Sequence, residues 1–390
     1  MTLQLENNTL AALTERSTSL YKERLLVSDI DEIEITYAQA GAKITQLHSM
    51  FEELGIKQGD KVALCSENMP HWGIVYLAIT SVGAVVVPIL PDFHCNEIRH
   101  IIKHSEAVAI FVSKKIYAKL DADDFNSSLQ YLFSLETLII LEDKTAKQSE
   151  LVSKGAEKIA QIKAKALQLA HRKTDSQILT INENDLASIL YTSGTTGLSK
   201  GVMLSHKNVI AQILQIQSIM EIHPEDKFLS ILPLAHTYEC SVGFLLPFAK
   251  GASIYYTSKV PSPKIILAAM QKVRPTCMLS VPLVIEKIYK TKVQAGFNKN
   301  KVIKFLYENL AFVRKKLNKI AGKKLQESFG GQMRLFGIGG AKLSSVVEAF
   351  LQEADFPYAI GYGLTETAPL IAAAVPGHTK VGTTGIIVPH

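Results

Sequence analysis

A chain of 390 residues is too long for one simple hydrophobic core and predicts two or more packed units. Its content of 47% hydrophobic and 20% charged residues is typical of a globular protein and excludes a disordered or fibrous chain. The net charge of +6 is too small to indicate a nucleic-acid partner, and we expect none. Four scattered cysteines without a CxxC pair give no metal-site pattern and fit a reducing compartment.

The N-terminal segment has no basic stretch followed by an apolar core, so we expect no signal peptide and a cytoplasmic protein. The first half of the chain alternates helical patterns with short apolar runs. The runs that predict strands are 61–68, 84–90, 108–113 and 135–143. Because strands separated by helix-length segments are joined by crossovers, these runs predict a mostly parallel sheet.

An uncharged stretch of 19 residues, 72–90, is long enough to span a bilayer. Its internal pattern indicates a different structure. Pro70 suits a first helical turn, and Gly83 suits a helix end. Val85 to Val87 form a β-branched run that Pro88 closes. The stretch therefore predicts a buried helix followed by a buried parallel strand.

A polar, lysine-rich stretch at 144–178 is expected to form a surface helix and a connector. A second alternation of strands and helices follows it. Its predicted strands are 186–194, 228–236, 252–257, 276–282 and 333–340. This pattern again indicates strands joined by helical crossovers.

The segment from Glu286 to Gln326 carries twelve lysines and arginines against two glutamates, a local charge of 12 − 2 = +10. Its apolar residues recur at helical spacing. One interpretation is a solvated helical face. The other is a patch that meets anionic lipid headgroups, which would make the protein a peripheral membrane protein.

The stretch YTSGTTGLSKG, at 191–201, combines glycines, hydroxyl groups and one lysine. Gly194, Gly197 and Gly201 allow tight turns in which backbone N–H groups approach a ligand. The Thr and Ser hydroxyls add donors, and Lys200 adds a positive charge. This combination is typical of a phosphate-binding loop. The spacing does not fit a Walker A loop, which excludes a P-loop phosphotransferase.

The loop resembles the phosphate-loop signature of the adenylate-forming superfamily, which includes acyl-CoA synthetases, luciferases and peptide-synthetase adenylation domains. Three further motifs of that superfamily follow in the expected order. They are LPLAHTYE at 232–239, GIGGAKLS at 337–344 and GYGLTETAP at 361–369. The stretch at 274–290 and the basic segment after it are most similar to the long-chain fatty acyl-CoA synthetase branch. Four ordered motifs identify the chain as a member of the superfamily.

The resemblance implies an α/β fold of two packed doubly wound sheets with an incomplete barrel-like subdomain. It implies subdomains at 1–175 and 176–390, whose sheets can interleave. The implied reaction joins a carboxylate to ATP, giving acyl-AMP and pyrophosphate, and CoA then displaces AMP. The attacking group is the carboxylate of the substrate itself, so the protein has to position two reactants and neutralise phosphate charge.

The resemblance also implies which residues act. The implied catalytic residues are Lys200 beside the phosphates, His236 near the reacting carboxylate, Thr365 on the α-phosphate and Glu366. The implied nucleotide-binding residues are Thr192, Ser193, Gly194, Thr195, Thr196, Gly197, Gly339, Gly340, Ala341, Gly361, Tyr362 and Gly363. Tyr362 would stack on adenine, and Gly363 would be a site where added bulk blocks the pocket. Glu366 and Thr192 are the implied Mg²⁺ ligands, because Mg²⁺ prefers hard oxygen donors.

The substrate is expected to be a fatty acid. Relatives that activate amino acids carry an Asp near the LPLAHTYE motif, and a buried ammonium group without a partner is costly. The window 232–239 has no Asp, and the apolar run at 240–254 is suited to line a tunnel for an alkyl chain. That run is also compatible with an ordinary helix core. A carrier-protein ligase and a non-catalytic nucleotide or acyl-adenylate binding module remain alternatives.

Two departures from the family pattern have consequences. Leu283 stands where the long-chain branch usually has Arg. The chain ends at VGTTGIIVPH without the Thr-Gly-Asp that binds ribose or the small C-terminal domain that supplies a lysine and the CoA surface. The resemblance thus implies a truncated large N-terminal domain, which is expected to bind nucleotide or acyl-adenylate better than it turns them over.

Overall fold

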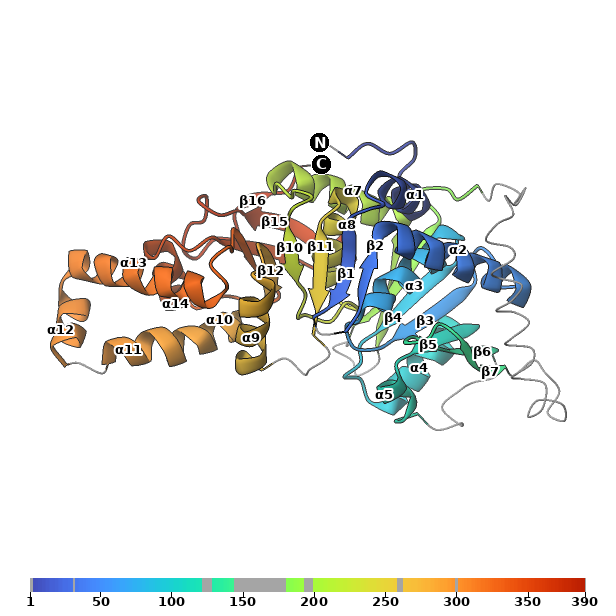
Figure 1. Cartoon of the computed structure of the whole chain (residues 1–390), viewed down its shortest axis with the longest axis horizontal. Coiled ribbons are helices and arrows are strands. Elements are labelled where there is room, and N and C mark those ends of the chain that lie inside the picture. The colour runs from blue at the N-terminus through green and yellow to red at the C-terminus, as the bar shows by residue number, and fades with distance from the viewer. Residues whose placement is uncertain are drawn as a thin grey trace.

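The computed structural model describes residues 3–30, 32–120, 128–143, 180–192, 199–257, 262–298 and 301–389. The expected surface helix and connector at 144–178 lie outside these ranges. The described elements form two sheets with helices on their faces (Figure 1). This is the α/β architecture of two packed doubly wound sheets that the resemblance implied.

The first sheet has seven strands in the order β7-β6-β5-β3-β4-β8-β9. Its strands are β3 (Lys61–Cys65), β4 (Val85–Ile89), β5 (Ala109–Val112), β6 (Tyr131–Ser134), β7 (Ile140–Asp143), β8 (Leu186–Thr192) and β9 (Lys200–Ser205). The inner strands pair in parallel, and β7 and β9 pair antiparallel at the edges. Because parallel strands end at the same edge of a sheet, the carboxyl end of β8 lies at the same edge as those of β4 and β3.

The second sheet has nine strands in the order β16-β15-β14-β13-β12-β10-β11-β1-β2. Its strands are β1 (Leu25–Asp29), β2 (Glu34–Thr36), β10 (Lys227–Leu229), β11 (Ser253–Tyr256), β12 (Cys277–Ser280), β13 (Leu335–Ile338), β14 (Tyr358–Gly363), β15 (Leu370–Ala374) and β16 (Ile386–Ile387). The strands β14, β13, β12, β10, β11 and β1 pair in parallel. Strand β2 pairs antiparallel at one edge, and β15 and β16 add an antiparallel edge on the other side. This edge forms no closed barrel within the described residues, which agrees with an incomplete barrel-like unit.

The helices cover both sheets. They are α1 (Leu10–Leu20), α2 (Tyr37–Leu54), α3 (Pro70–Ser81), α4 (Cys95–Ser105), α5 (Lys114–Tyr117), α7 (His206–Ile219), η2 (Glu239–Leu245), α8 (Leu246–Lys250), α9 (Pro263–Val273), α10 (Pro282–Ile288), η3 (Tyr289–Gln294), α11 (Ala295–Asn298), α12 (Lys301–Asn309), α13 (Ala311–Ser328), α14 (Ser345–Glu353) and η4 (Thr365–Thr367). Helices α10 to α14 lie at the opposite end of the molecule from the seven-stranded sheet (Figure 1).

The uncharged stretch at 72–90 forms helix α3 and strand β4, as predicted. Every residue from Pro70 to Thr80 is buried, which explains why the helix needs no polar face. None of the helices in the described ranges has the length and apolar character needed to cross a bilayer.

The predicted strand at 135–143 is wrong in its first half. Strand β6 lies earlier, at 131–134, and the chain then turns back into β7. The turn contains no glycine or proline that would mark it in the sequence. Leu138 takes the left-handed conformation instead, with φ of 58°, and its N–H donates to the carbonyl of Ser134 at 2.8 Å. The apolar run at 135–143 therefore contains the turn and second strand of a β-hairpin, and not one continuous strand.

Sheet membership crosses the subdomain division expected at 175/176. Strands β1 and β2 join the nine-stranded sheet through pairing of β1 with β11. Strands β8 and β9 join the seven-stranded sheet through β4. The sheets therefore interleave along the chain, and the position of a domain boundary stays a prediction.

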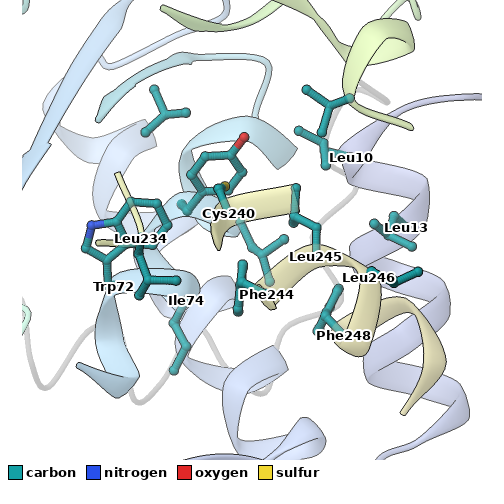
Figure 2. Packing of buried hydrophobic residues seen from close by; sticks show 14 of the residues in the cluster. Leu10, Leu13, Trp72, Ile74, Leu234, Cys240, Phe244, Leu245, Leu246 and Phe248 are labelled. Atoms are coloured by element: carbon teal, nitrogen blue, oxygen red, sulfur yellow. The ribbon is translucent and has the colours of Figure 1, made fainter. Parts of the chain in front are cut away.

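The largest hydrophobic cluster draws on both sheets and on the helices between them. In β3, Val62 and Leu64 point into this cluster, whereas Ala63 and Cys65 point into a separate one on the other face. Trp72 of α3 and Phe244 of η2 meet edge to face, with ring centroids 6.5 Å apart (Figure 2). A Cβ atom on Gly73 would lie 2.3 Å from the Phe244 ring, so the close approach of α3 and η2 requires glycine there.

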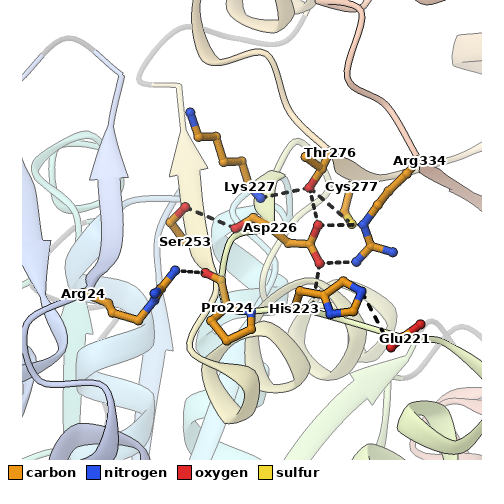
Figure 3. A network of polar contacts seen from close by, with 10 residues as sticks. All are labelled: Arg24, Glu221, His223, Pro224, Asp226, Lys227, Ser253, Thr276, Cys277 and Arg334. Atoms are coloured by element: carbon orange, nitrogen blue, oxygen red, sulfur yellow. Dashed lines mark hydrogen bonds and ion pairs between the residues drawn. The ribbon is translucent and has the colours of Figure 1, made fainter. Parts of the chain in front are cut away.

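A buried carboxylate joins three strands of the nine-stranded sheet. Asp226, just before β10, accepts hydrogen bonds from the Arg334 guanidinium, from the Thr276 hydroxyl at 2.7 Å and from the backbone N–H of His223 at 2.7 Å (Figure 3). Burial opposes ionisation of Asp226, but the Arg334 hydrogen bonds and the other donors outweigh it and hold the pKa of the carboxyl below its ordinary value. Asp226 therefore stays charged and fixes the starts of β10, β12 and β13.

Replacing Asp226 with Ala is expected to lower the free energy of unfolding by about 2–3 kcal/mol, since Arg334 would lose its partner. The loss should be smaller than for a fully buried pair because 36% of the Arg334 side chain is exposed. The control is Lys319→Ala, which removes an exposed ion pair with Asp355 and should cost less than about 1 kcal/mol. Urea denaturation measures both, and equal losses would contradict the assigned role of Asp226.

Candidate functional site

A cleft of about 300 Å³ opens at the carboxyl ends of strands from both sheets. This is the edge at which open α/β sheets bind ligands. The chain segments that form it follow β8, β13 and β14, together with the turn before η2. The lining residues are Thr192, His236, Thr237, Tyr238, Gly339, Gly340, Gly361, Gly363, Leu364, Thr365, Glu366, Pro369 and Leu370.

The cleft brings together eight residues that the sequence predicted as site residues, from segments far apart in the chain. They are Thr192, His236, Gly339, Gly340, Gly361, Gly363, Thr365 and Glu366. Ala341 and Tyr362 do not line it, and 50% of the Tyr362 side chain is exposed on β14 between the two lining glycines. The predicted phosphate-loop residues Ser193, Gly194, Thr195, Thr196 and Gly197 lie outside the described ranges. Their contacts stay predictions.

Lys200 lies at the margin of the cleft and not on its lining. It opens strand β9, where it is exposed and pairs in register with Thr192 at the end of β8. Because Thr192 lines the cleft, the antiparallel pairing keeps the Lys200 backbone next to that wall.

Two positions of the cleft favour glycine for different reasons. Gly340 has φ of 82°, a conformation that side chains rarely adopt, and a Cβ there would meet Val281 only at 3.6 Å. A Cβ on Gly363, by contrast, would lie 1.8 Å from the carbonyl oxygen of Pro369. Gly363 is therefore required by the packing of β14 on its own return strand. Bulk at Gly363 would disrupt the fold, so the expectation that such a change only blocks the pocket is wrong.

The turn that carries His236 is fixed by Asn68, a residue that the sequence did not indicate. Asn68 follows β3 in the other sheet, and its side-chain amide donates to the Leu232 carbonyl at 2.6 Å and accepts from the Leu234 N–H at 2.9 Å. The same amide donates to Ser230 at 3.1 Å. These bonds fix the turn that carries His236. Only the contact between the two sheets shows this role, since nothing near Asn68 in the sequence indicates it.

His236 has a defined protonation pattern. The imidazole is partly open to the cleft, and desolvation by the surrounding walls lowers its pKa below the ordinary value. The backbone N–H of Tyr238 donates to Nδ1 at 3.2 Å. Because a neutral imidazole whose Nδ1 accepts carries its proton on Nε2, His236 offers an Nε2–H donor.

Five lining residues were not among the predicted site residues: Thr237, Tyr238, Leu364, Pro369 and Leu370. The first two follow His236 directly. The Thr237 side chain is 3% exposed, and its hydroxyl has no hydrogen-bond partner among the described residues. The Tyr238 ring lies 3.2 Å from where a Cβ on Gly339 would stand, so it packs against the turn after β13. The motif at 232–239 marked the segment, but only the structure shows which of its side chains face the cleft.

Behind this turn, Glu239 is 1% exposed at the start of η2. Burial raises the pKa of its carboxyl to about 8, against the lowering effect of a hydrogen bond from Ser230 at 2.5 Å. Glu239 is therefore mostly neutral at pH 7. Its carboxyl occupies the space that Gly243 leaves, since a Cβ there would lie 2.8 Å from Glu239 Cδ.

The run at 240–254 does not form the expected tunnel wall. Its apolar side chains pack into the shared hydrophobic cluster, and none of its residues lines the cleft. The ordinary core interpretation is the right one for these residues. Leu283, which replaces the usual Arg, is 73% exposed at the start of α10.

Glu239 predicts a pH dependence of stability. The folded protein keeps the proton up to a pKa of about 8, whereas the unfolded chain releases it near the ordinary value of 4.5. The stability tied to this group is complete below pH 4.5 and is lost as the pH rises towards 8, by at most about 1.4 kcal/mol per pH unit. Glu239→Gln has no proton to release, so its unfolding free energy should fall less over this range. Urea unfolding at a series of pH values tests this, and parallel curves for both proteins would refute it.

The described lining of the cleft offers few side chains that could bind a metal ion. Within the described ranges, no three His, Cys, Asp or Glu residues come together as a metal cluster. Glu366 and Thr192 nevertheless line the same cleft and offer oxygen donors. This donor set suits Mg²⁺, which usually binds through one or two protein oxygens plus phosphate and water.

Comparison with known proteins agrees with the fold and the cleft. A model of the family described as AMP-binding enzyme matches residues 14–390. The chloroplastic long-chain-fatty-acid–[acyl-carrier-protein] ligase AEE15 of Arabidopsis thaliana is 27% identical over 90% of this chain and 54% of its own length. The long-chain-fatty-acid–CoA ligase FadD15 of Mycobacterium tuberculosis is 27% identical over 91% of this chain and 60% of its own. The chain thus spans little more than half the length of these curated relatives.

Solved structures show the same fold at low sequence identity. The inhibitor-bound N-terminal domain of FACL13 from Mycobacterium tuberculosis has a TM-score of 0.72 at 17% identity, covering 97% of this chain and 82% of that one. The anthranilate CoA ligase AuaEII in complex with anthranoyl-AMP has a TM-score of 0.73 at 16% identity, covering 97% of this chain and 63% of that one. Because the family model matches nearly its whole length, this chain belongs to the AMP-binding enzyme family.

Proposed function

We propose that this protein activates a long-chain fatty acid with ATP. The carboxylate oxygen of the acid attacks the α-phosphorus, the bond to the β-phosphate breaks, and acyl-AMP and pyrophosphate form. In the second step the thiol of CoA attacks the acyl carbon and AMP leaves. The observation that carries the proposal is the cleft, in which four separate family motifs or their flanks converge at the carboxyl ends of both sheets.

The residues of the cleft supply positioning and charge for this reaction, and no covalent nucleophile is required. The Nε2–H of His236 would donate to the reacting carboxyl group, and the Thr365 hydroxyl would bond the α-phosphate. Gly339 and Gly340 would let the nucleotide approach the backbone. The proposal also includes the nucleotide contacts that the resemblance implies for Ala341 and Tyr362.

The phosphates and the metal belong on the β8 side of the cleft. The loop from Thr192 to Gly197 would bind the β- and γ-phosphates, with Lys200 beside them. Glu366 and Thr192 would hold Mg²⁺, which neutralises phosphate charge when bound. Two features of the described lining support a metal ion at this place. Glu366 is its one carboxylate, and it contains no Lys or Arg that could neutralise the phosphates instead.

The assignment of a fatty acid rests on the curated relatives and on the absence of Asp at 232–239. The acceptor has two candidates. CoA is favoured by FadD15, and a carrier protein is favoured by AEE15, which is similar over the same share of the chain. Transfer of a labelled acyl group to CoA or to holo acyl-carrier protein separates them.

Calorimetric titration with non-hydrolysable acyl-AMP analogues tests the pocket. Affinity should rise with acyl length, by up to about fourfold per buried methylene, and an aminoacyl analogue should bind more weakly. Thr365→Trp fills the cleft and should abolish binding. Val346→Trp adds the same bulk to an exposed position on α14 outside the cleft and should leave binding unchanged. Length-independent affinity would refute the fatty-acid assignment, and retained binding in Thr365→Trp would refute the cleft.

Lys200→Ala separates the phosphate role from the pocket. An acyl-AMP analogue lacks the β- and γ-phosphates, so its affinity should not change. The affinity for Mg²⁺–ATP should fall by roughly tenfold, because one charged contact to phosphate is lost. Lys207→Ala, which removes an exposed lysine paired with Glu183 beyond the end of β9, is the matched control. Equal loss for both ligands would contradict the proposed position of Lys200.

A further inference from the structure

Two consecutive helices, α12 and α13, form a basic hairpin (301–328) at the end of the molecule farthest from the seven-stranded sheet (Figure 1). Helix α12 buries none of its nine residues. The hairpin contains eight lysines and arginines against two glutamates, so its charge of 8 − 2 = +6 equals the net charge of the whole chain. The positive charge of the protein is thus concentrated on one projecting element.

The inner face of α13 is fixed against α14. Asn318, Gly322 and Leu325 are its buried residues. A Cβ on Gly322 would lie 2.7 Å from Ala354, so the two helices touch closely there. Arg314 and Asn318 both donate to the Glu353 carboxylate, at 3.1 and 2.8 Å. These contacts set the rotation of α13 and decide which side chains face outward.

The outer face of α13 combines apolar and basic side chains. Phe312, Lys316, Ile320 and Lys323 follow one another at intervals of four, four and three residues, so they share one side of the helix. Phe312 is 73% exposed and Ile320 is 49% exposed. Phe305 on α12 is 64% exposed. Large apolar groups exposed in a row beside lysines are unusual for a face that only meets water.

The lysines of this face are available to a partner. Lys304 pairs with Glu308 and Lys319 pairs with Asp355 within the protein. Lys316, Lys323 and Lys324 are exposed and make no ion pair with the described residues. Lys315 is exposed at the edge of this face and also interacts with the Glu353 carboxylate through its charge. A partner with a continuous negative surface would complement them.

We infer that the outer face of the basic hairpin docks on an anionic lipid bilayer. The face belongs to a projecting helix and not to a groove, which suits a flat partner. Phe305, Phe312 and Ile320 would enter the boundary between headgroups and acyl chains, and the lysines would lie at the level of the lipid phosphates. The apolar residues favour lipid over nucleic acid, which lysines alone would not distinguish. This inference does not depend on the proposed reaction.

The test is co-sedimentation of the protein with vesicles of phosphatidylcholine, with and without phosphatidylglycerol. Binding is expected only with the anionic lipid and should weaken with added salt. Replacing Lys315, Lys316, Lys323 and Lys324 with Gln should reduce binding by about a hundredfold or more. The control replaces four exposed lysines on the seven-stranded side with Gln, and it should bind like the parent. These are Lys57, Lys103, Lys114 and Lys119.

A second pair of variants tests the exposed apolar side chains of the basic hairpin. Phe305→Ser with Phe312→Ser should reduce vesicle binding by about tenfold, whereas Met203→Ser with Ile387→Ser removes exposed apolar groups elsewhere and should not. Circular dichroism and thermal unfolding confirm that each variant is folded. Equal binding to neutral vesicles, binding that survives the hairpin substitutions, or hairpin-dependent binding to duplex RNA in place of vesicles would each overturn the inference.

Discussion

The close contact of Gly73 with Phe244 is the constraint on which the arrangement of the two sheets depends. It brings α3, which covers the seven-stranded sheet, against η2, which belongs to the nine-stranded one. Helix α3 begins only two residues after Asn68, and η2 begins three residues after His236. The packing of the two helices therefore also places the amide of Asn68 on the turn that carries His236. The cleft is a consequence of how the sheets pack.

The same packing determines the charge state of the site. The contact excludes water from the region behind the turn, so Glu239 keeps its proton and adds no negative charge there. His236 stays neutral because the cleft walls partly desolvate it. Glu366 remains the one carboxylate of the described lining, which has no cation. A polyanionic ligand would therefore need its counter-charge from the margin, where Lys200 stands, or from a metal ion.

The sequence predicted the parts of this protein that local chemistry determines. Helix α3 and strand β4 followed from proline, glycine and a β-branched run, because each residue type restricts its own backbone. The motifs likewise indicated most of the cleft. The hairpin at Leu138 was missed because its turn uses a residue with no turn preference. Asn68 was missed, and the tunnel and core interpretations of Phe244 stayed open, because both residues depend on a contact between segments more than 160 residues apart.

The cleft and the basic hairpin are connected through one stretch of chain. Strand β12 ends at Ser280, and the next residue, Val281, is the neighbour that a Cβ on Gly340 would meet in the cleft wall. The chain then enters α10, and Glu286 there accepts a hydrogen bond from the Ser344 N–H at 2.9 Å, just after the Gly339–Gly340 turn. The start of the helical region α10–α14 thus contacts the cleft wall at two points, Val281 and Glu286. A bilayer that held the hairpin would orient this cleft relative to the lipid surface, without any contact between lipid and the residues proposed to act on ATP.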